Sequence, residues 1–181
     1  MPRIPPVDVD AAPEAVRKLL ELQPAHTEVL GTVAHAETLL EPFMRMAGAF
    51  LQDLELAHEL RELVILRVAH MLGCEYEWTQ HVPIARSLGF SEERIEAVRR
   101  GPDSGLFDGV ECAVLSFTDD ALRNTSASDA TFDAVEKHLG HRALVEITLA
   151  IGFYQMLARL LETAEVAIEE PSDSFVRDVT R

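Results

Sequence analysis

The sequence predicts an all-α fold. Along most of its 181 residues, apolar side chains recur at steps of three and four, which is the spacing of one face of a helix. No stretch alternates apolar and polar residues for long enough to predict a strand. Almost half of the residues (48%) are apolar, enough for one core, so we expect a single compact helical domain.

The expected elements run from an extended arm to a tail. Residues 1–12 contain several prolines and should form an extended arm, because proline removes a backbone donor and clashes inside a helix. Residues 13–170 should form the helical domain, and residues 171–181 a C-terminal tail. Apolar periodicity, prolines and capping residues predict helices over residues 13–23, 27–35, 37–54, 56–72, 75–88, 91–100, 110–122, 128–140 and 144–167.

The last of these helices differs from the others in composition. Residues 144–167 are apolar on nearly every side, whereas a surface helix is apolar on only one. We therefore expect this helix either at the centre of the fold or shared between the subunits of a homo-oligomer.

Charge and cysteine content argue against several classes of partner. The formal net charge of −15 would repel nucleic-acid phosphates and anionic membrane surfaces. The chain starts without an apolar leader, and charged residues interrupt its apolar C-terminal stretch, so we expect a cytoplasmic protein with small-molecule or subunit partners. Two cysteines, Cys74 and Cys112, do not make a secreted disulfide framework, although a transient bridge between them stays open.

The segment from Arg61 to Leu88 carries the residues with the clearest chemistry. Glu62 lies within an apolar helical run, so its carboxylate should be buried and should need a partner. Gly73 is expected to end that helix in a left-handed conformation. The next helix then places three ionisable side chains at steps of three and four, so that they face one common place: Cys74, Glu77 and His81.

These positions resemble a signature of the carboxymuconolactone decarboxylase and alkylhydroperoxidase D superfamily. Its peroxidase branch has Glu, eleven residues, Cys, two residues, Cys, three residues and His. This sequence has Glu62, Cys74, Glu77 and His81 at that spacing, with Glu in place of the second Cys. The stretch EYEWTQH, residues 75–81, is similar to the decarboxylase-type branch. The resemblance covers residues 40–165 and implies an alkylhydroperoxidase D-like helical fold, a trimeric or hexameric homo-oligomer, and no cofactor.

The acid and base candidates each have a catalytic and a structural interpretation. Glu62 could accept protons in a dry pocket, or it could form a buried ion pair with Arg67, with His58 or with another helix. Glu77 could hold the His81 imidazole in one tautomer and leave its other nitrogen free to move a proton. Alternatively, Glu77 could form a capping box with Cys74 and only satisfy backbone donors.

The remaining candidates are a thiol, an indole and a second imidazole. The start of a helix favours a thiolate at Cys74, and the alternative is a small buried residue that fills the helix junction. Trp78 and His70 are candidates for lining a substrate pocket, although core packing is the more common role of both types. A metal site is not expected, because the spacing matches no metal motif for the available ligands, Glu62, His70, Glu77 and His81.

The resemblance implies a carboxymuconolactone decarboxylase-like enzyme. Glu62, Glu77 and His81 would transfer protons on a small carboxylated or lactone substrate, with His81 protonating the carbanion or enolate left by loss of carbon dioxide. An acidic surface does not favour the approach of an anionic substrate. The alternative is an alkylhydroperoxidase-type thiol peroxidase acting through Cys74, although its second cysteine is missing. A further alternative is an oligomeric or binding module without catalysis.

Overall fold

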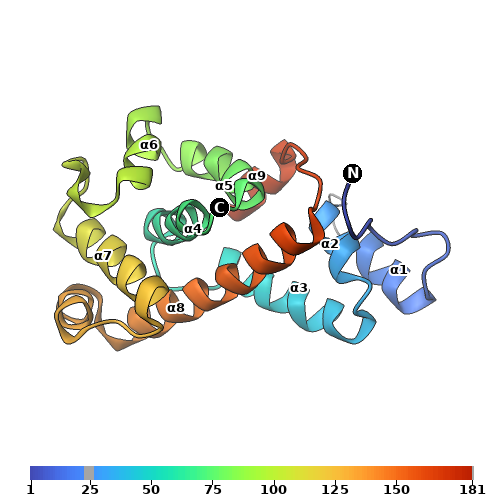
Figure 1. Cartoon of the computed structure of the whole chain (residues 1–181), viewed down its shortest axis with the longest axis horizontal. Helices are drawn as coiled ribbons and strands as arrows, with labels where there is room; N and C mark the ends of the chain where they lie inside the picture. The colour runs from blue at the N-terminus through green and yellow to red at the C-terminus, as the bar shows by residue number, and fades with distance from the viewer. Residues whose placement is uncertain (23–26, 181) are drawn as a thin grey trace.

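The computed structural model describes residues 1–22 and 27–180, and it confirms the all-α class (Figure 1). The end of the first predicted helix, at residue 23, lies outside these residues. Within them the chain forms no strand, and a short 3-10 helix (Pro102–Ser104) joins two of the helices. The α-helices are α1 (Glu14–Glu21), α2 (Glu28–Val33), α3 (Glu37–Gln52), α4 (His58–Leu72), α5 (Glu75–Ser87), α6 (Glu92–Arg100), α7 (Gly109–Asn124), α8 (Asp129–Ala164) and α9 (Asp173–Val179).

Local signals in the sequence set most of the helix boundaries. Gly73 has the expected left-handed conformation (φ 68°) at the end of α4. The Ser91 hydroxyl accepts a hydrogen bond from the Arg94 backbone N–H at 3.2 Å and so caps α6, as predicted. At the start of α7, Asp108 and Glu111 form a capping box that the sequence analysis did not identify.

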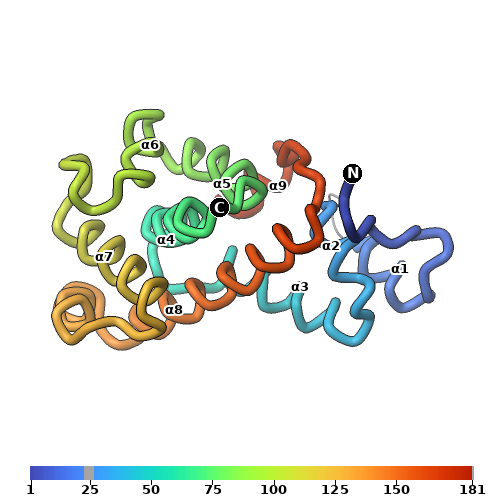
Figure 2. Tube along the Cα trace, viewed as in Figure 1, coloured from blue at the N-terminus to red at the C-terminus, as the bar shows by residue number. Residues whose placement is uncertain are grey.

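Helix α8 joins two helices that the sequence predicted separately. It runs without a loop from Asp129 to Ala164, but Gly140 leaves the helical conformation (φ 74°, ψ −179°). The chain changes direction there, as the orange part of the tube shows in Figure 2. Because positive φ strains residues that carry a Cβ atom, glycine at this position allows the two parts to meet at an angle.

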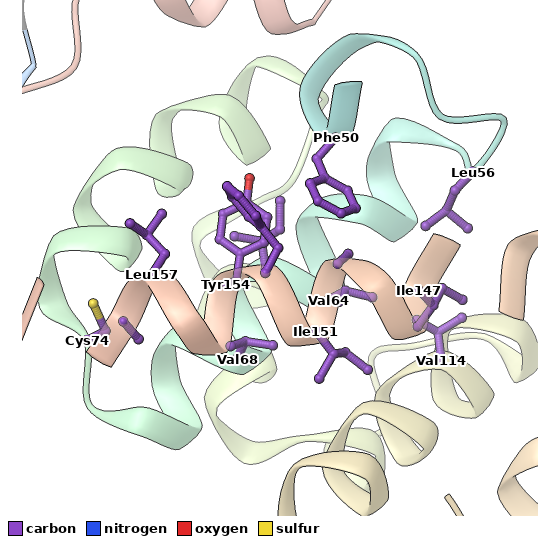
Figure 3. Packing of buried hydrophobic residues seen from close by; sticks show 14 of the residues in the cluster. Phe50, Leu56, Val64, Val68, Cys74, Val114, Ile147, Ile151, Tyr154 and Leu157 are labelled. Carbon is purple, nitrogen blue, oxygen red and sulfur yellow. The ribbon is translucent and has the colours of Figure 1, made fainter. Parts of the chain in front are cut away.

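The centre of the fold is the packing of α4 against α8, with α5 and α7 on the other sides of α4 (Figure 1). Nine consecutive residues of α4, from 61 to 69, are buried. Each fully buried aliphatic side chain contributes about 1.5–3 kcal/mol. The core joins α4, α7 and α8 through side chains that include Val64, Ile65, Val68, Val114, Ile147 and Ile151 (Figure 3).

Helix α8 is also long and apolar enough, by length and composition alone, to cross a membrane. Twelve of its residues are buried inside this domain, which accounts for its high hydropathy without a bilayer. The expectation of a central helix is therefore confirmed. Four large apolar side chains of α8 stay exposed: Phe132, Val145, Leu149 and Met156.

Both ends of the chain fold back onto the domain. In the N-terminal arm, the backbone N–H of Arg3 donates to the Ala164 carbonyl at 2.8 Å, and that of Val7 donates to the Gly31 carbonyl at 3.0 Å. The predicted tail contains a helix, α9, which packs on α5 (Figure 1). The C-terminal segment thereby reaches the helix that carries His81.

Candidate acid–base site

A hydrogen-bonded chain of three side chains links α4 to α5. The Nε of Arg61 donates to Oε1 of Glu62 at 2.8 Å, and Nδ1 of His81 lies 2.8 Å from Oε2 of the same carboxylate. The Arg61 and Glu62 side chains are 1% and 0% exposed. Arg61 also donates to the backbone carbonyls of Leu51, at the end of α3, and of Val179, at the end of α9 (3.1 Å). Three helices thus hold the guanidinium in place.

These contacts determine the charge of Glu62 and the tautomer of His81. Burial raises the pKa of Glu62, but His81 and Arg61 together bring this pKa below its usual value. An ionised carboxylate can only accept hydrogen bonds, so Nδ1 of His81 carries the hydrogen. Nε2 of His81 makes no hydrogen bond to any residue in the described part of the chain. Glu62 is therefore paired with its neighbour in sequence and with α5, and not with Arg67.

His81 lines a cavity of about 250 Å³ between α2, α3, α5, α8 and α9. Polar side chains reach this cavity from α5, including Glu77 and Gln80. Most of the remaining wall is apolar, with side chains such as Phe43, Met44, Phe153 and Leu157 from α3 and α8. A mostly apolar cavity with a few polar groups on its wall is typical of small-molecule sites.

Glu77 is buried at the cavity without a partner. The residue is 2% exposed, and neither carboxyl oxygen has a hydrogen bond to a residue of the described ranges, 1–22 and 27–180. Burial, and then the negative charge of Glu162, raise the pKa of Glu77 to about 9. Glu77 is therefore a neutral carboxylic acid at neutral pH. The predicted contact with His81 is taken by Glu62, and the capping box with Cys74 does not form, because Cys74 makes no side-chain cap.

Tyr154 of α8 is a further polar group of the site. Its ring meets the His81 ring edge-on, with centroids 5.3 Å apart, and it lines the cavity. Tyr154 and Leu157 project from the side of α8 on which Phe50 lies (Figure 3). Burial, and then the charges of Glu62 and Glu77, raise the pKa of Tyr154 well above its usual value, so it is a neutral phenol.

Cys74 lies in the hydrophobic core and does not line the cavity (Figure 3). It is 1% exposed, and burial followed by the Glu77 carboxyl raises the pKa of the thiol to about 12. Burial therefore outweighs the expected effect of the helix N-terminus. The second cysteine, Cys112, is also free, and its Sγ donates to the carbonyls of Pro102 (3.4 Å) and Phe107 (3.6 Å).

Trp78 and His70 lie away from the cavity. Trp78 packs in a separate core cluster, and the guanidinium of Arg99 covers its ring at 3.7 Å. His70 meets the edge of the same indole, with centroids 6.4 Å apart. Neither residue lines this cavity, where the sequence analysis had placed both as candidates. Because His70 lies beside Trp78 and away from the cavity, the possible metal ligands Glu62, His70, Glu77 and His81 do not converge. The described residues contain no cluster of three or more side chains that could hold a metal ion.

The C-terminal segment is hydrogen-bonded to α5, and the sequence analysis did not predict this contact. The Tyr76 hydroxyl donates to Oε1 of Glu169 at 2.6 Å, and the side-chain amide of Gln80 donates to the Glu169 carbonyl at 2.6 Å. Beyond this anchor, Phe175 and Val179 line the cavity. Helix α9 is therefore part of the site.

The fold and the site together define an alkylhydroperoxidase D-like helical protein, in which a buried acid and a histidine from successive helices meet at a cavity. Residues 37–120 match the carboxymuconolactone decarboxylase family. This match supports the relation to the carboxymuconolactone decarboxylase and alkylhydroperoxidase D superfamily that the sequence signature predicted.

Several solved structures share this fold. A peroxidase-related protein from Silicibacter sp. TM1040 has a TM-score of 0.77 at 18% identity, and the match covers 96% of this chain and 94% of that one. An alkylhydroperoxidase AhpD core protein from Ralstonia eutropha JMP134 has a TM-score of 0.76 at 19% identity, covering 99% and 97%. The debrominase Bmp8 has a TM-score of 0.74 at 17% identity, covering 97% of each chain. No curated protein matches the chain in sequence.

Proposed function

We propose that this protein is a carboxymuconolactone decarboxylase-like enzyme in which His81 transfers protons on a small carboxylated or lactone molecule bound in the cavity. One observation carries the proposal: the chain of contacts from Arg61 through Glu62 ends on an imidazole that lines the cavity. A carboxylate that fixes the tautomer and orientation of an imidazole is a recurring arrangement in acid–base catalysis.

The charges of the site support a role for each group. Ionised Glu62 accepts the hydrogen of Nδ1 of His81, and its negative charge balances that of the ring in the step in which Nε2 carries a proton. This proton leaves from Nε2 to the carbanion or enolate that remains after a C–C or C–H bond breaks, and the neutral ring removes a proton in the reverse direction. Such catalysis contributes about 10²–10⁴ in rate. Neutral Glu77 donates a hydrogen bond to the negative oxygen that develops on the substrate.

A comparison of two histidine variants tests the role of His81. Lactones and carboxylated lactones are incubated with the protein in D₂O, and proton exchange or carbon dioxide release is followed by NMR. On the best substrate, His81→Gln should reduce the rate by about 10²-fold or more. His70→Gln is the matched control, because His70 lies beside Trp78 and not at the cavity. Equal rates for wild type and His81→Gln would show that the proposal is wrong.

Thiol peroxidase activity through Cys74 has less support. The thiol is buried, its pKa is raised to about 12, and it is not a lining residue of the cavity. Treatment with an alkyl hydroperoxide and a sulfenic acid trap should therefore label Cys74 slowly. Rapid stoichiometric labelling, together with hydroperoxide consumption that is lost in Cys74→Ser, would favour the peroxidase over proton transfer.

We also propose that the chain forms the homo-oligomer, a trimer or hexamer, that the sequence resemblance implies. Support comes from α8, which leaves Val145, Leu149 and Met156 exposed by 58%, 51% and 51%. Removing such side chains from water favours association. Sedimentation velocity of the purified chain should give a mass three or six times that of one chain. A single monomeric species at micromolar concentration would contradict this.

A further inference from the structure

The wall of the cavity limits the charge of the molecule that can bind. No lysine or arginine of residues 1–22 and 27–180 lines it. Arg61 is behind the wall, where it donates to Glu62, Leu51 and Val179. The charge of a protonated His81 is already balanced by Glu62. A carboxylate placed in this cavity would thus be removed from water without a cation of its own, which is strongly unfavourable.

The same wall is suited to an uncharged hydrogen-bonding group. Glu77 is buried and unpaired, so a ligand that gives it a partner removes the cost of an unsatisfied polar group. Its burial keeps the carboxyl group protonated at neutral pH, and a protonated carboxyl can both donate and accept. Nε2 of His81 supplies an acceptor on the same face of α5, one helical turn away.

The volume of the cavity limits the size of the ligand. An apolar cavity of about 150 Å³ in another protein admits benzene. The volume here is about 250 Å³. That leaves space for one ring with small substituents. Aromatic side chains on the wall, Phe43, Phe153 and Tyr154, favour contact with such a ring.

We propose that the site takes small, uncharged, single-ring molecules that carry one hydrogen-bonding group, such as phenols or unsubstituted lactones, and that it rejects carboxylates of the same size. This inference rests on the proposed function, because it assigns the substrate class of the same site. The resemblance implies a carboxylated or a lactone substrate, and this inference favours the lactone.

Three matched probes test the charge requirement. They are 4-methylphenol, 4-hydroxybenzoate, in which a carboxylate replaces the methyl group, and the methyl ester of 4-hydroxybenzoate, which restores neutrality. Binding is read from the ¹³C-labelled methyl group of Met44, which lines the cavity, with exposed Met156 as internal control. 4-Methylphenol should shift only Met44, with Kd below about 1 mM. 4-Hydroxybenzoate should bind about tenfold more weakly or worse, and the ester should recover binding.

Two outcomes would overturn the inference. One is binding of 4-hydroxybenzoate that is as tight as that of 4-methylphenol. The other is a Met44 signal that no uncharged probe shifts at concentrations of about 10 mM.

A glycine on the cavity wall allows the location to be tested. Gly48 of α3 lines the cavity, and a Cβ atom there would meet no other atom within 4 Å. Gly48→Leu should therefore fold, fill the cavity and abolish the Met44 shift, whereas Gly48→Ala should weaken it in part. Gly152→Leu is the control, because Gly152 is an exposed helical glycine of α8 with equally free space. A folded Gly48→Leu protein that binds 4-methylphenol normally would contradict the inference.

Failure of the inference can be distinguished from failure of the proposed function. The Met44 titration needs no turnover, and it can be repeated with His81→Gln. If 4-hydroxybenzoate binds best while His81→Gln is inactive, proton transfer stands and the ligand class is wrong. If 4-methylphenol binds best while His81→Gln retains full activity, the ligand class stands and the role of His81 is wrong.

Discussion

Two arginines of α4, Arg61 and Arg67, are each paired with a buried carboxylate, and they show how similar contacts can serve different purposes. Arg67 holds Asp119 of α7 through two hydrogen bonds of 2.5 and 2.7 Å, and it donates to the carbonyls of Val98 and Arg99. Arg123 adds a bond to Asp119 at 3.2 Å. Neither Arg67 nor Asp119 lines the cavity. Each side chain of this cluster is paired with its own neighbours, and the cluster joins α4, α6 and α7.

The pair of Arg61 and Glu62 differs in what lies beside it. Its second carboxylate oxygen meets an imidazole, and this imidazole lines a cavity together with Glu77, whose buried carboxyl group has no partner among the described residues. A buried ion pair alone is therefore weak evidence for a functional site. A titratable group at a cavity and a buried group without a partner are the features that distinguish this cluster from the one around Arg67.

The largest effect of a single substitution on stability at neutral pH is expected in the cluster of Arg67. Asp119→Ala leaves a buried guanidinium without its carboxylate, which should lower the free energy of unfolding by about 3–5 kcal/mol. Urea denaturation measures this loss. Asp133→Ala is the control, because Asp133 is exposed and forms no ion pair with the residues that the structure describes. The Met44 titration of the folded Asp119→Ala protein should be unchanged, and a changed titration would mean that the two clusters are coupled.

The second effect concerns Glu77 and depends on pH. Its pKa is raised from an ordinary 4.5 to about 9, so the folded protein binds one more proton than the unfolded chain between these values. The free energy of unfolding should therefore fall as the pH rises from about 4.5 to about 9, by up to about 1.4 kcal/mol per pH unit. Glu77→Gln removes this titration, so its stability should exceed that of wild type increasingly above pH 5.

Denaturation curves at several pH values measure this difference. The two proteins should have similar stabilities below pH 4.5, where Glu77 is protonated in both the folded and the unfolded state. Parallel pH profiles for wild type and Glu77→Gln would show that the carboxyl group is not held neutral.

Local signals explain why most of the fold could be predicted from the sequence. Gly73, Ser91 and the prolines act on their own helix ends, so their effects can be recognised without knowledge of distant contacts. The break at Gly140 shows the limit of such signals. The sequence indicated a helix end there, but whether a loop or an abrupt bend follows depends on how α8 packs against α4 and α7.

The site could be predicted only in part, because it depends on helix rotation and on distant segments. The spacing placed Glu77 and His81 on one face of a helix, since residues four apart share a face, and both line the cavity. Trp78 projects from nearly the same side of α5 as His81. It packs in another cluster only because of how α5 is placed against its neighbouring helices. The contacts of Arg61 with Leu51 and Val179 join segments far apart in the sequence.

A smaller effect on stability is expected at Gly101, and comparison with Gly105 separates the cost of backbone strain from the cost of a contact with Arg67. Gly101 has φ 84°, and a Cβ atom there would lie 2.8 Å from Nη2 of Arg67. Arg67 cannot easily move, because four hydrogen bonds hold it. Gly101→Ala should therefore destabilise the protein by about 1–3 kcal/mol. Gly105→Ala is the control, with φ 77° and no atom within 4 Å, and it should cost less than Gly101→Ala.

The smallest effect is expected for a third arginine pair, which is exposed to water. Arg86 donates to both oxygens of Glu92, at 2.5 and 2.9 Å, so its geometry is as favourable as that of Arg67 and Asp119. The side chains are 51% and 70% exposed, however, and solvent and salt screen the attraction. Glu92→Gln should leave the urea midpoint unchanged within error at physiological salt. A loss as large as that of Asp119→Ala would mean that geometry, and not burial, determines the importance of these pairs.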